Sequence, residues 1–209
     1  HGLRLTCQRK AGNICAAGSL TWSFTMKSCR HLDESECIAR AQRGDVLAFS
    51  ELVSRYQDRI YRFLARLTRS PDDALDLTQE TFLNAYQALG RWRPQARFST
   101  WLLQIARNLA FDQLRRSRRV EFVTLEEEQA SGIQDAGPTP EAALQTTQRL
   151  HALERALARL PAEHREILLL REIEDLGYED IAAVLGIHLG TVKSRLARAR
   201  AGLLEHMPP

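Results

Sequence analysis

The sequence predicts an all-α fold of two small domains, a four-helix N-terminal domain and a C-terminal helix-turn-helix domain, joined by a flexible acidic linker. Apolar residues recur at the three- and four-residue spacing of helices, whereas the strict alternation of strands is scarce. Pro and Gly residues interrupt this spacing between the helical segments. Two basic blocks, at 107–119 and 193–200, flank an acidic stretch at 121–141.

Length and composition are those of a soluble globular protein. The 209 residues are 44% hydrophobic and 26% charged, which leaves room for two small domains. The net charge of +3 does not by itself indicate a nucleic-acid partner. No apolar run approaches the roughly 18 residues of a membrane span, and no secretory signal is recognisable at the start. We therefore expect a cytoplasmic protein without membrane insertion.

Residues 1–30 show no helical or strand periodicity, so we expect a disordered or non-native extension there. The cysteines Cys7, Cys15, Cys29 and Cys37 are spaced too widely for zinc knuckles, and free thiols are the simpler interpretation. Cys29 and Cys37 could in principle ligate a metal together with His31. We expect no metal and no cofactor.

The first domain is expected over residues 31–120. A strongly amphipathic helix covers 49–67, and Ser70 followed by Pro71 has the residue types of an N-cap and a first helical position. The helix that follows reaches about residue 89. After an interruption at 90–96 containing Pro94, a third helix is expected from 99 to about 116.

The linker is expected over 121–140 because this segment is acidic, poor in apolar residues and rich in Gly and Pro. The second domain then covers 141–209. Its helices are expected at 141–159, through 167–173, at 178–185 and at 191–204, with a turn at Gly186 before the last. Two helices joined by a short turn containing Gly are typical of a helix-turn-helix.

The last helix carries a basic face. Val192, Leu196, Ala199 and Leu203 repeat at the spacing of an inward face. The remaining positions are polar, and arginine and lysine there could read guanine edges or hold phosphates. A helix that is basic only for solubility is the alternative. The outward residues are Lys193, Ser194, Arg195, Arg198 and Arg200.

Aromatic residues precede the first basic block. Trp92, Phe98 and Trp101 lie in and just after the segment that ends the second helix, and cations follow at 115–119. Aromatic rings beside cations suit unpaired bases, which stack on the rings while the cations hold the backbone. Phe98 and Trp101 could equally be ordinary core residues, and both interpretations remain open at this point.

Three segments resemble bacterial sigma factors of the extracytoplasmic-function (ECF) group. They are DLTQETFLNAY from Asp76, FSTWLLQIARN from Phe98 and GTVKSRLARAR from Gly190, within a resemblance from about Asp33 to Leu204. It implies a protein that binds core RNA polymerase and promoter DNA, responds to envelope or other stress and is controlled by an anti-sigma factor.

The resemblance also implies roles for particular residues. A polar face would dock on core polymerase, a loop with the following helix would melt and bind the minus-ten element, and the last helix would read the minus-thirty-five element. The residues that would dock on polymerase are Asp76, Gln79, Glu80 and Asn84. Those at the minus-ten element would be Arg93, Arg97, Phe98, Trp101, Asn108, Asp112, Arg115, Arg116, Arg118 and Arg119. Those at the minus-thirty-five element would be Thr191, Lys193, Ser194, Arg195, Arg198 and Arg200.

Other functions fit the sequence less well. A phosphate-binding Gly loop, a His-Glu-x-x-His motif and a recognisable nucleophile are all missing from the sequence, so we expect no enzyme. A free-standing helix-turn-helix regulator is the main alternative. It would need neither a polymerase-docking face nor an aromatic melting loop. A protein–protein adaptor with incidental basic helices is a third possibility.

Overall fold

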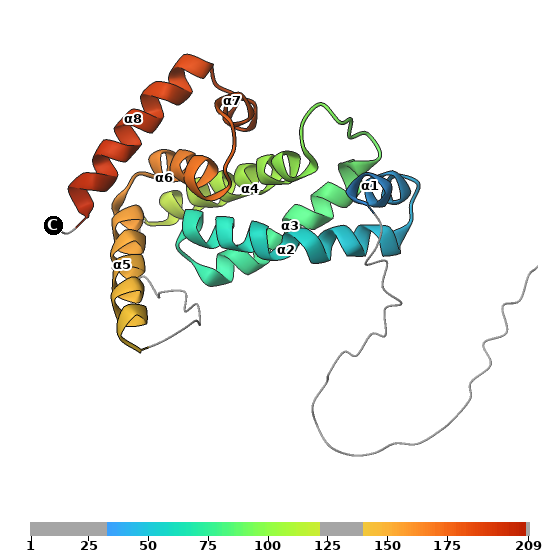
Figure 1. Ribbon diagram of the computed structural model, residues 1–209. Coiled ribbons are helices and arrows are strands. Elements are labelled where there is room, and N and C mark those ends of the chain that lie inside the picture. The colour runs from blue at the N-terminus through green and yellow to red at the C-terminus, as the bar shows by residue number, and fades with distance from the viewer. Residues whose placement is uncertain (1–32, 122–139, 208–209) are drawn as a thin grey trace, which may run out of the picture.

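The computed structural model describes residues 33–121 and 140–207, and these residues form helices without any strand, which confirms the predicted all-α class. The first four helices make up the N-terminal bundle and the rest the C-terminal bundle (Figure 1). The N-terminal bundle contains α1 (Glu34–Gln42), α2 (Val46–Thr68), α3 (Pro71–Leu89) and α4 (Phe98–Glu121). The C-terminal bundle contains α5 (Pro140–Arg159), α6 (Ala162–Leu168), the π-helical turn η1 (Leu169–Ile173), α7 (Tyr178–Leu185) and α8 (Leu189–His206).

Local capping sets the helix boundaries of the N-terminal bundle. The Ser70 hydroxyl accepts a hydrogen bond from the Asp73 backbone N at 3.2 Å, which confirms the predicted N-cap of α3. Asp45 caps α2 in the same way. A helix separate from α2 was not predicted at Glu34–Gln42, where the structure has α1. The turn between them contains Gly44 at a φ of 90°, a conformation that glycine adopts without steric cost.

The core of the N-terminal bundle lies around α2, which packs against α1, α3 and α4. Its buried face carries Leu52, Ile60, Phe63, Leu64 and Leu67. The inward face of α3 is buried, including the hydroxyl-bearing Thr81, whose side chain donates to the Leu77 carbonyl at 2.6 Å. This packing holds α3 and α4 side by side and fixes the directions in which their outer faces point.

The C-terminal bundle contains the predicted helix-turn-helix, formed by α7 and α8. Gly186 ends α7 in the left-handed conformation, with a φ of 64°. Helix α8 packs on α5, α6 and α7 through the predicted inward residues, of which Val192, Leu196 and Ala199 are buried. Two boundaries differ from prediction, because residues 169–173 form a π-helical turn and α8 continues to His206.

The two bundles are packed against each other. Helix α4 contacts α7, and α2 contacts α6 and η1 (Figure 1). Buried apolar side chains of both bundles belong to one continuous cluster. The predicted extension at 1–30 lies outside the described residues, as does the predicted linker apart from its end residues 121 and 140. Among the helices described, none is long and apolar enough to cross a membrane.

Candidate nucleic-acid interface

Helix α3 presents a mixed acidic and apolar outer face. Of the predicted docking residues, Asp76, Gln79 and Glu80 are exposed and Asn84 is half-buried. Beside them lie two leucines that the prediction missed, Leu75 and Leu83, which are 52% and 58% exposed. The two leucines are two helical turns apart, so each adds a separate apolar site to this charged face, and apolar side chains rimmed by charge are typical of protein interfaces.

A helical wheel would have identified both leucines from the sequence. Leu75 and Leu83 fall outside the buried stripe that includes Ala74, Leu77 and Ala85. Only the polar residues of that outer face were predicted to dock. The outer face of α3 therefore offers both charge and apolar area to a partner.

The segment between α3 and α4 is anchored at its start. The Gln42 side chain in α1 donates from Nε2 to the backbone carbonyls of Leu89 and Trp92, at 3.1 and 3.0 Å. Beyond this anchor Arg93 and Arg97 are exposed, as predicted for groups that would hold a DNA backbone. Gln42 thereby positions the loop, and no local pattern in the sequence marks it, because its partners lie about 50 residues away.

Aromatic rings from the loop and α4 form a cluster with Tyr56 of α2. The Phe98 ring centroid lies 5.6 Å from that of Tyr56, 5.7 Å from that of Trp92 and 5.5 Å from that of Trp101. Phe98 is only 2% exposed, so it is a core residue, whereas Trp92 and Trp101 are half-buried. Of the two interpretations left open, core packing applies to Phe98. Trp92 and Trp101 keep part of their surface available for stacking.

The outer face of α4 continues from this cluster toward the predicted basic residues. Asn108 is exposed and accepts a 3.1 Å hydrogen bond from Arg107 Nη1. Farther along, Arg115 is exposed and forms an ion pair with Asp112, while Arg116 is exposed as well. The side chains of Arg118 and Arg119 lie outside the described residues. The loop, Trp101 and this face form one run of surface.

Helix α8 has an open polar face, but the predicted residues are not equally placed on it. Lys193, Ser194 and Arg198 are exposed, and Arg198 Nε donates to the Ser194 carbonyl one turn earlier, at 3.3 Å. Thr191 is half-buried near the start of the helix. A further exposed residue, Ala197, lies between them and was not predicted. The centre of this open face is therefore formed by the small side chains of Ser194 and Ala197, and the cations Lys193 and Arg198 lie beside them.

Two of the arginines predicted to point outward form ion pairs with acids of neighbouring elements. Arg195 faces α6, where it forms an ion pair with Glu163 at 3.6 Å and keeps only 22% of its side chain exposed. Arg200 donates from Nη2 to Glu172 at 2.7 Å. No local pattern in the sequence marks either pairing, because the acids lie 28 or more residues before their partners. Arg195 is thus half-buried and only partly outward, because helix packing places it beside α6.

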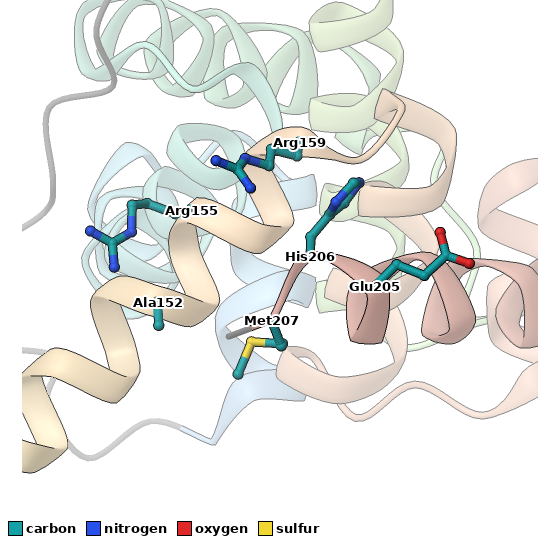
Figure 2. Close-up of a pocket in the computed structure, with 6 residues that line it drawn as sticks. All are labelled: Ala152, Arg155, Arg159, Glu205, His206 and Met207. Atoms are coloured by element: carbon teal, nitrogen blue, oxygen red, sulfur yellow. The ribbon is translucent and has the colours of Figure 1, made fainter. Parts of the chain in front are cut away.

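A hollow opens between α5 and the end of α8, remote from the faces described above. It is lined by Ala152, Arg155 and Arg159 from α5 and by Glu205, His206 and Met207 from the end of α8 (Figure 2). None of the predicted site residues lines it. Within the described part of the chain, no group of three or more His, Cys, Asp or Glu side chains could hold a metal ion.

Two family descriptions match the chain. Residues 52–120 match Sigma-70 region 2, and residues 150–203 match Sigma-70 region 4. The first range contains α3, most of α2 and nearly all of α4, and the second contains α6, α7 and most of α8. The proposed interfaces thus fall inside the matched ranges.

Curated proteins from several bacteria are similar to the chain. It is 36% identical over 183 residues to RNA polymerase sigma-H factor of Pseudomonas aeruginosa, covering 84% of this chain and 94% of that protein. It is 34% identical to ECF RNA polymerase sigma-E factor of Escherichia coli, with coverages of 85% and 96%. The match to ECF RNA polymerase sigma factor SigE of Mycolicibacterium smegmatis is 38% identical and covers 81% of this chain, but spans only 65% of that relative.

Two solved structures share the fold. One is the sigma factor RpoE in complex with the anti-sigma factor NepR from Bartonella quintana, with a TM-score of 0.64, 29% identity and coverage of 77% of this chain and 97% of that chain. The other is CnrH in complex with the cytosolic domain of CnrY, with a TM-score of 0.58, 26% identity and coverages of 82% and 95%.

Proposed function

The chain belongs to the ECF group of sigma factors, and from this premise we propose that it binds core RNA polymerase and directs promoter-specific initiation of transcription. The sigma factors are not a family of enzymes, and we propose that this chain has no catalytic activity of its own. It would act in the cytoplasm, where core polymerase and promoter DNA are found. The observation that carries the proposal is the presence of two distinct surfaces, the outer face of α3 and the open face of α8, on two bundles of one chain.

The outer face of α3 is proposed to dock on core polymerase. The exposed acids Asp76 and Glu80 would attract a positively charged surface of the polymerase. Gln79 and Asn84 lie beside them and would form hydrogen bonds to it. The exposed Leu75 and Leu83 supply apolar area at the same place, and an interface core needs such area whereas the rim is polar. A free-standing regulator has no use for this face, which is why we favour the sigma factor.

The loop before α4 and the outer face of that helix are proposed to open and bind the minus-ten element. Trp101, with Trp92 beside it at a centroid distance of 6.0 Å, offers a ring surface for an unstacked base. The buried Phe98 supports these rings from below and would act through them. The cations Arg93 and Arg97 from the loop, followed by Asn108, Asp112, Arg115, Arg116, Arg118 and Arg119 of α4, would contact the strand nearby.

The open face of α8 is proposed to lie in the major groove of the minus-thirty-five element. Lys193, Ser194 and Arg198 are exposed there and have the hydrogen-bonding groups that read base edges. Thr191 lies at the N-terminal turn, where helix and DNA approach most closely. Arg195 and Arg200, each paired with an acid, would contact phosphates or hold the helix in place.

An anti-sigma factor is proposed as the controlling partner, acting under envelope or other stress. Two solved relatives support this, because RpoE was solved in complex with the anti-sigma factor NepR and CnrH in complex with the cytosolic domain of CnrY. A partner that covers the α3 face would prevent polymerase from docking there.

The decisive experiment is transcription in vitro with the purified chain, core polymerase and a library of promoters. We expect initiation from a subset that shares upstream and downstream elements, and weak duplex binding by the chain alone. Tight sequence-specific binding to duplex without polymerase, together with no initiation, would favour the free-standing regulator.

A further inference from the structure

A side chain of α1 reaches the point where α3 ends and the loop before α4 begins (Figure 1). Gln42, the last residue of α1, donates from Nε2 to the Leu89 carbonyl at 3.1 Å and to the Trp92 carbonyl at 3.0 Å. Both partners are carbonyl oxygens, so only the NH2 group of the amide can face them, and it carries one hydrogen for each. A single residue thereby ties the end of α3 and the start of the loop to α1.

Gln42 is itself held in place by the core of the N-terminal bundle. Ile38 and Ala41 of the same helix are buried where α1 packs on α2. The turn that follows Gln42 is closed by Arg40, which donates from Nε and Nη2 to Asp45 Oδ2 at 2.9 and 2.6 Å. Asp45 also caps the first turn of α2. The position of the Gln42 side chain is therefore set by the packed core, and not by the loop that it contacts.

Beyond Trp92, the hydrogen bonds of the loop join near neighbours in the sequence. The Gln95 backbone N donates to the Arg93 carbonyl at 2.7 Å, and Arg93 Nη1 donates to the Trp92 carbonyl at 3.1 Å. Both Arg93 and Gln95 are exposed. Bonds between residues so close in sequence shape a loop without fixing where it lies on the protein. Its placement therefore depends on its two ends, which are held by Gln42 and by the buried Phe98 of α4.

Gln42 acts on the aromatic cluster through the residue whose carbonyl it holds. The Trp92 ring centroid lies 5.7 Å from that of the buried Phe98 and 6.0 Å from that of Trp101. Trp92 and Trp101 are half-buried, so part of each ring remains open to a base. The groups of a binding site must be held within about 0.5 Å of their working positions. A shift of the Trp92 backbone would therefore move one of the two rings out of place.

We propose that Gln42 is a positioning residue for promoter opening. It fixes the Trp92 ring beside Trp101, and these two rings receive a base of the minus-ten element as the duplex opens. This role rests on the proposed function. Stacking on the rings offsets the free energy of unpairing the base, so a misplaced Trp92 leaves the paired promoter favoured. Gln42 lies outside the proposed polymerase-docking face of α3, and docking does not depend on it.

A purely structural role for Gln42 would have different consequences. The last four carbonyls of a helix lack partners within that helix, and Leu89 is the last residue of α3. If Gln42 only satisfied such a carbonyl, its loss would destabilise the bundle and impair polymerase docking and promoter opening together. A positioning role impairs opening alone, and only while the Trp92 ring is present.

The test uses holoenzyme assembled from core polymerase and the full chain carrying single substitutions. Gln42→Met keeps the length of the side chain and removes both donor hydrogens. Gln42→Asn keeps the amide but is one methylene too short to reach both carbonyls. Gln57→Met is the matched control, because Gln57 is an exposed glutamine of α2 outside the proposed surfaces.

Each holoenzyme transcribes two templates with the same nontemplate strand, one fully paired and one held open at the minus-ten element by mismatches. We expect Gln42→Met to lower initiation from the paired template about five-fold or more, the lower end of what one stacked base contributes. The opened template should lose much less, because its base is already unpaired. Gln42→Asn should act in the same way, and Gln57→Met should change neither template. Association with core polymerase, measured by pull-down, should stay at the wild-type level in all three.

A double variant tests whether Gln42 acts through Trp92. Trp92→Ala by itself should lower initiation from the paired template. Adding Gln42→Met to it should cause little further loss, because the ring that Gln42 positions is gone. Independent effects of the two residues would instead multiply.

The outcomes separate the positioning role from the proposed function. Equal losses on the paired and the opened template in Gln42→Met, or losses that multiply with Trp92→Ala, show a structural role and overturn the positioning role. Wild-type initiation from both templates overturns it as well. If Gln42→Met does not fold, Gln42→Asn decides by the same comparisons. Absence of initiation by the wild-type holoenzyme from both templates overturns the proposed function, and the role of Gln42 in promoter opening with it.

Discussion

Arg165 of the C-terminal bundle donates a 2.5 Å hydrogen bond from Nη1 to the carbonyl oxygen of Leu67 at the end of α2. The same guanidinium also donates to the carbonyls of Leu157, Ala158 and Leu160 at the end of α5. A buried cation thereby satisfies carbonyls at the C-terminal ends of two helices from different bundles, where the helix dipole also favours positive charge. Burial lowers the pKa of Arg165 to about 10, which still leaves it charged at neutral pH.

Replacing Arg165 should destabilise the protein substantially. Arg165→Met keeps much of the volume but leaves buried carbonyls of both helix ends without donors, and we expect a loss of about 2–4 kcal/mol in the free energy of unfolding. Arg165→Lys should fall in between, because one ammonium cannot reach both ends as a planar guanidinium does. Urea unfolding followed by circular dichroism measures this. A loss below about 0.5 kcal/mol for Arg165→Met would show that water replaces the bonds.

Stability should depend on pH through Glu166. Burial raises the pKa of Glu166 to about 7. The positive charges of Arg107 and Arg195 lower this pKa in part, and the negative charge of Glu163 raises it further. Its Oε2 atom has no hydrogen-bond partner among the described residues, which suits a protonated carboxyl, and Oε1 remains an acceptor for Arg107. Between about pH 4.5 and pH 7 the folded protein therefore keeps a proton on Glu166 that the unfolded chain, with a pKa near 4.5, has released.

The sign of this effect follows from proton linkage. Because the pKa of Glu166 is higher in the folded protein, its protonation contributes to the free energy of unfolding. This contribution is fully present below about pH 4.5 and is lost as the pH rises through about 7, a decrease of roughly 3 kcal/mol in all. Glu166→Gln cannot titrate, so its unfolding free energy should lack this decrease. The measurement is urea unfolding of both proteins from pH 5 to pH 8. Parallel curves would show that Glu166 does not titrate in this range.

The docking face on α3 should tolerate substitution without loss of fold. Asp76→Lys combined with Glu80→Lys should abolish association with core polymerase, because both side chains are exposed and lie off the buried stripe. Leu83→Asp should weaken it independently by removing apolar area. Asp58→Lys, which reverses the charge of an exposed acid on α2, is the control for a charge reversal outside the proposed face. Retention of core polymerase by the double variant at the wild-type level would mean that docking occurs elsewhere.

Base reading on α8 should depend on residues of the open face. Lys193→Ala or Arg198→Ala should change which minus-thirty-five sequences are used, because a lost base contact costs about 1–3 kcal/mol at one position. Arg200→Ala should weaken all sequences alike and flatten the salt dependence, as expected for a phosphate contact. Arg195, turned toward Glu163, should behave in the same way as Arg200. The measurement is transcription across a library of upstream elements at two salt concentrations.

A changed ranking with Arg195→Ala and an unchanged one with Lys193→Ala would contradict the orientation of α8. Glu163→Gln separates the two roles of Arg195 further. It frees the guanidinium from its ion pair, so it should strengthen binding to all upstream elements if Arg195 reaches phosphate. It should have no effect on DNA if Arg195 only holds α8 on α6.

The sequence by itself determined the helical class, most helix boundaries and the family. Caps and breaks act over three or four residues, and for that reason Ser70 and Pro71 could be recognised at the start of α3 and Gly186 at the end of α7. The inward face of α8, including Val192 and Leu196, also followed from spacing alone. The short α1 was missed because nine residues give too little periodicity to separate it from α2.

The tertiary structure decided what the outward residues do. Packing of α8 on α6 turned Arg195 toward Glu163, and packing of α2 beside α4 made Phe98 part of the core. Arg59 and Glu174 are 115 residues apart, and their contact exists because the two bundles pack together. The partners of a side chain depend on how whole helices rotate and pack against one another. That packing is decided by the free energy of the assembled core, so a local sequence pattern does not encode it.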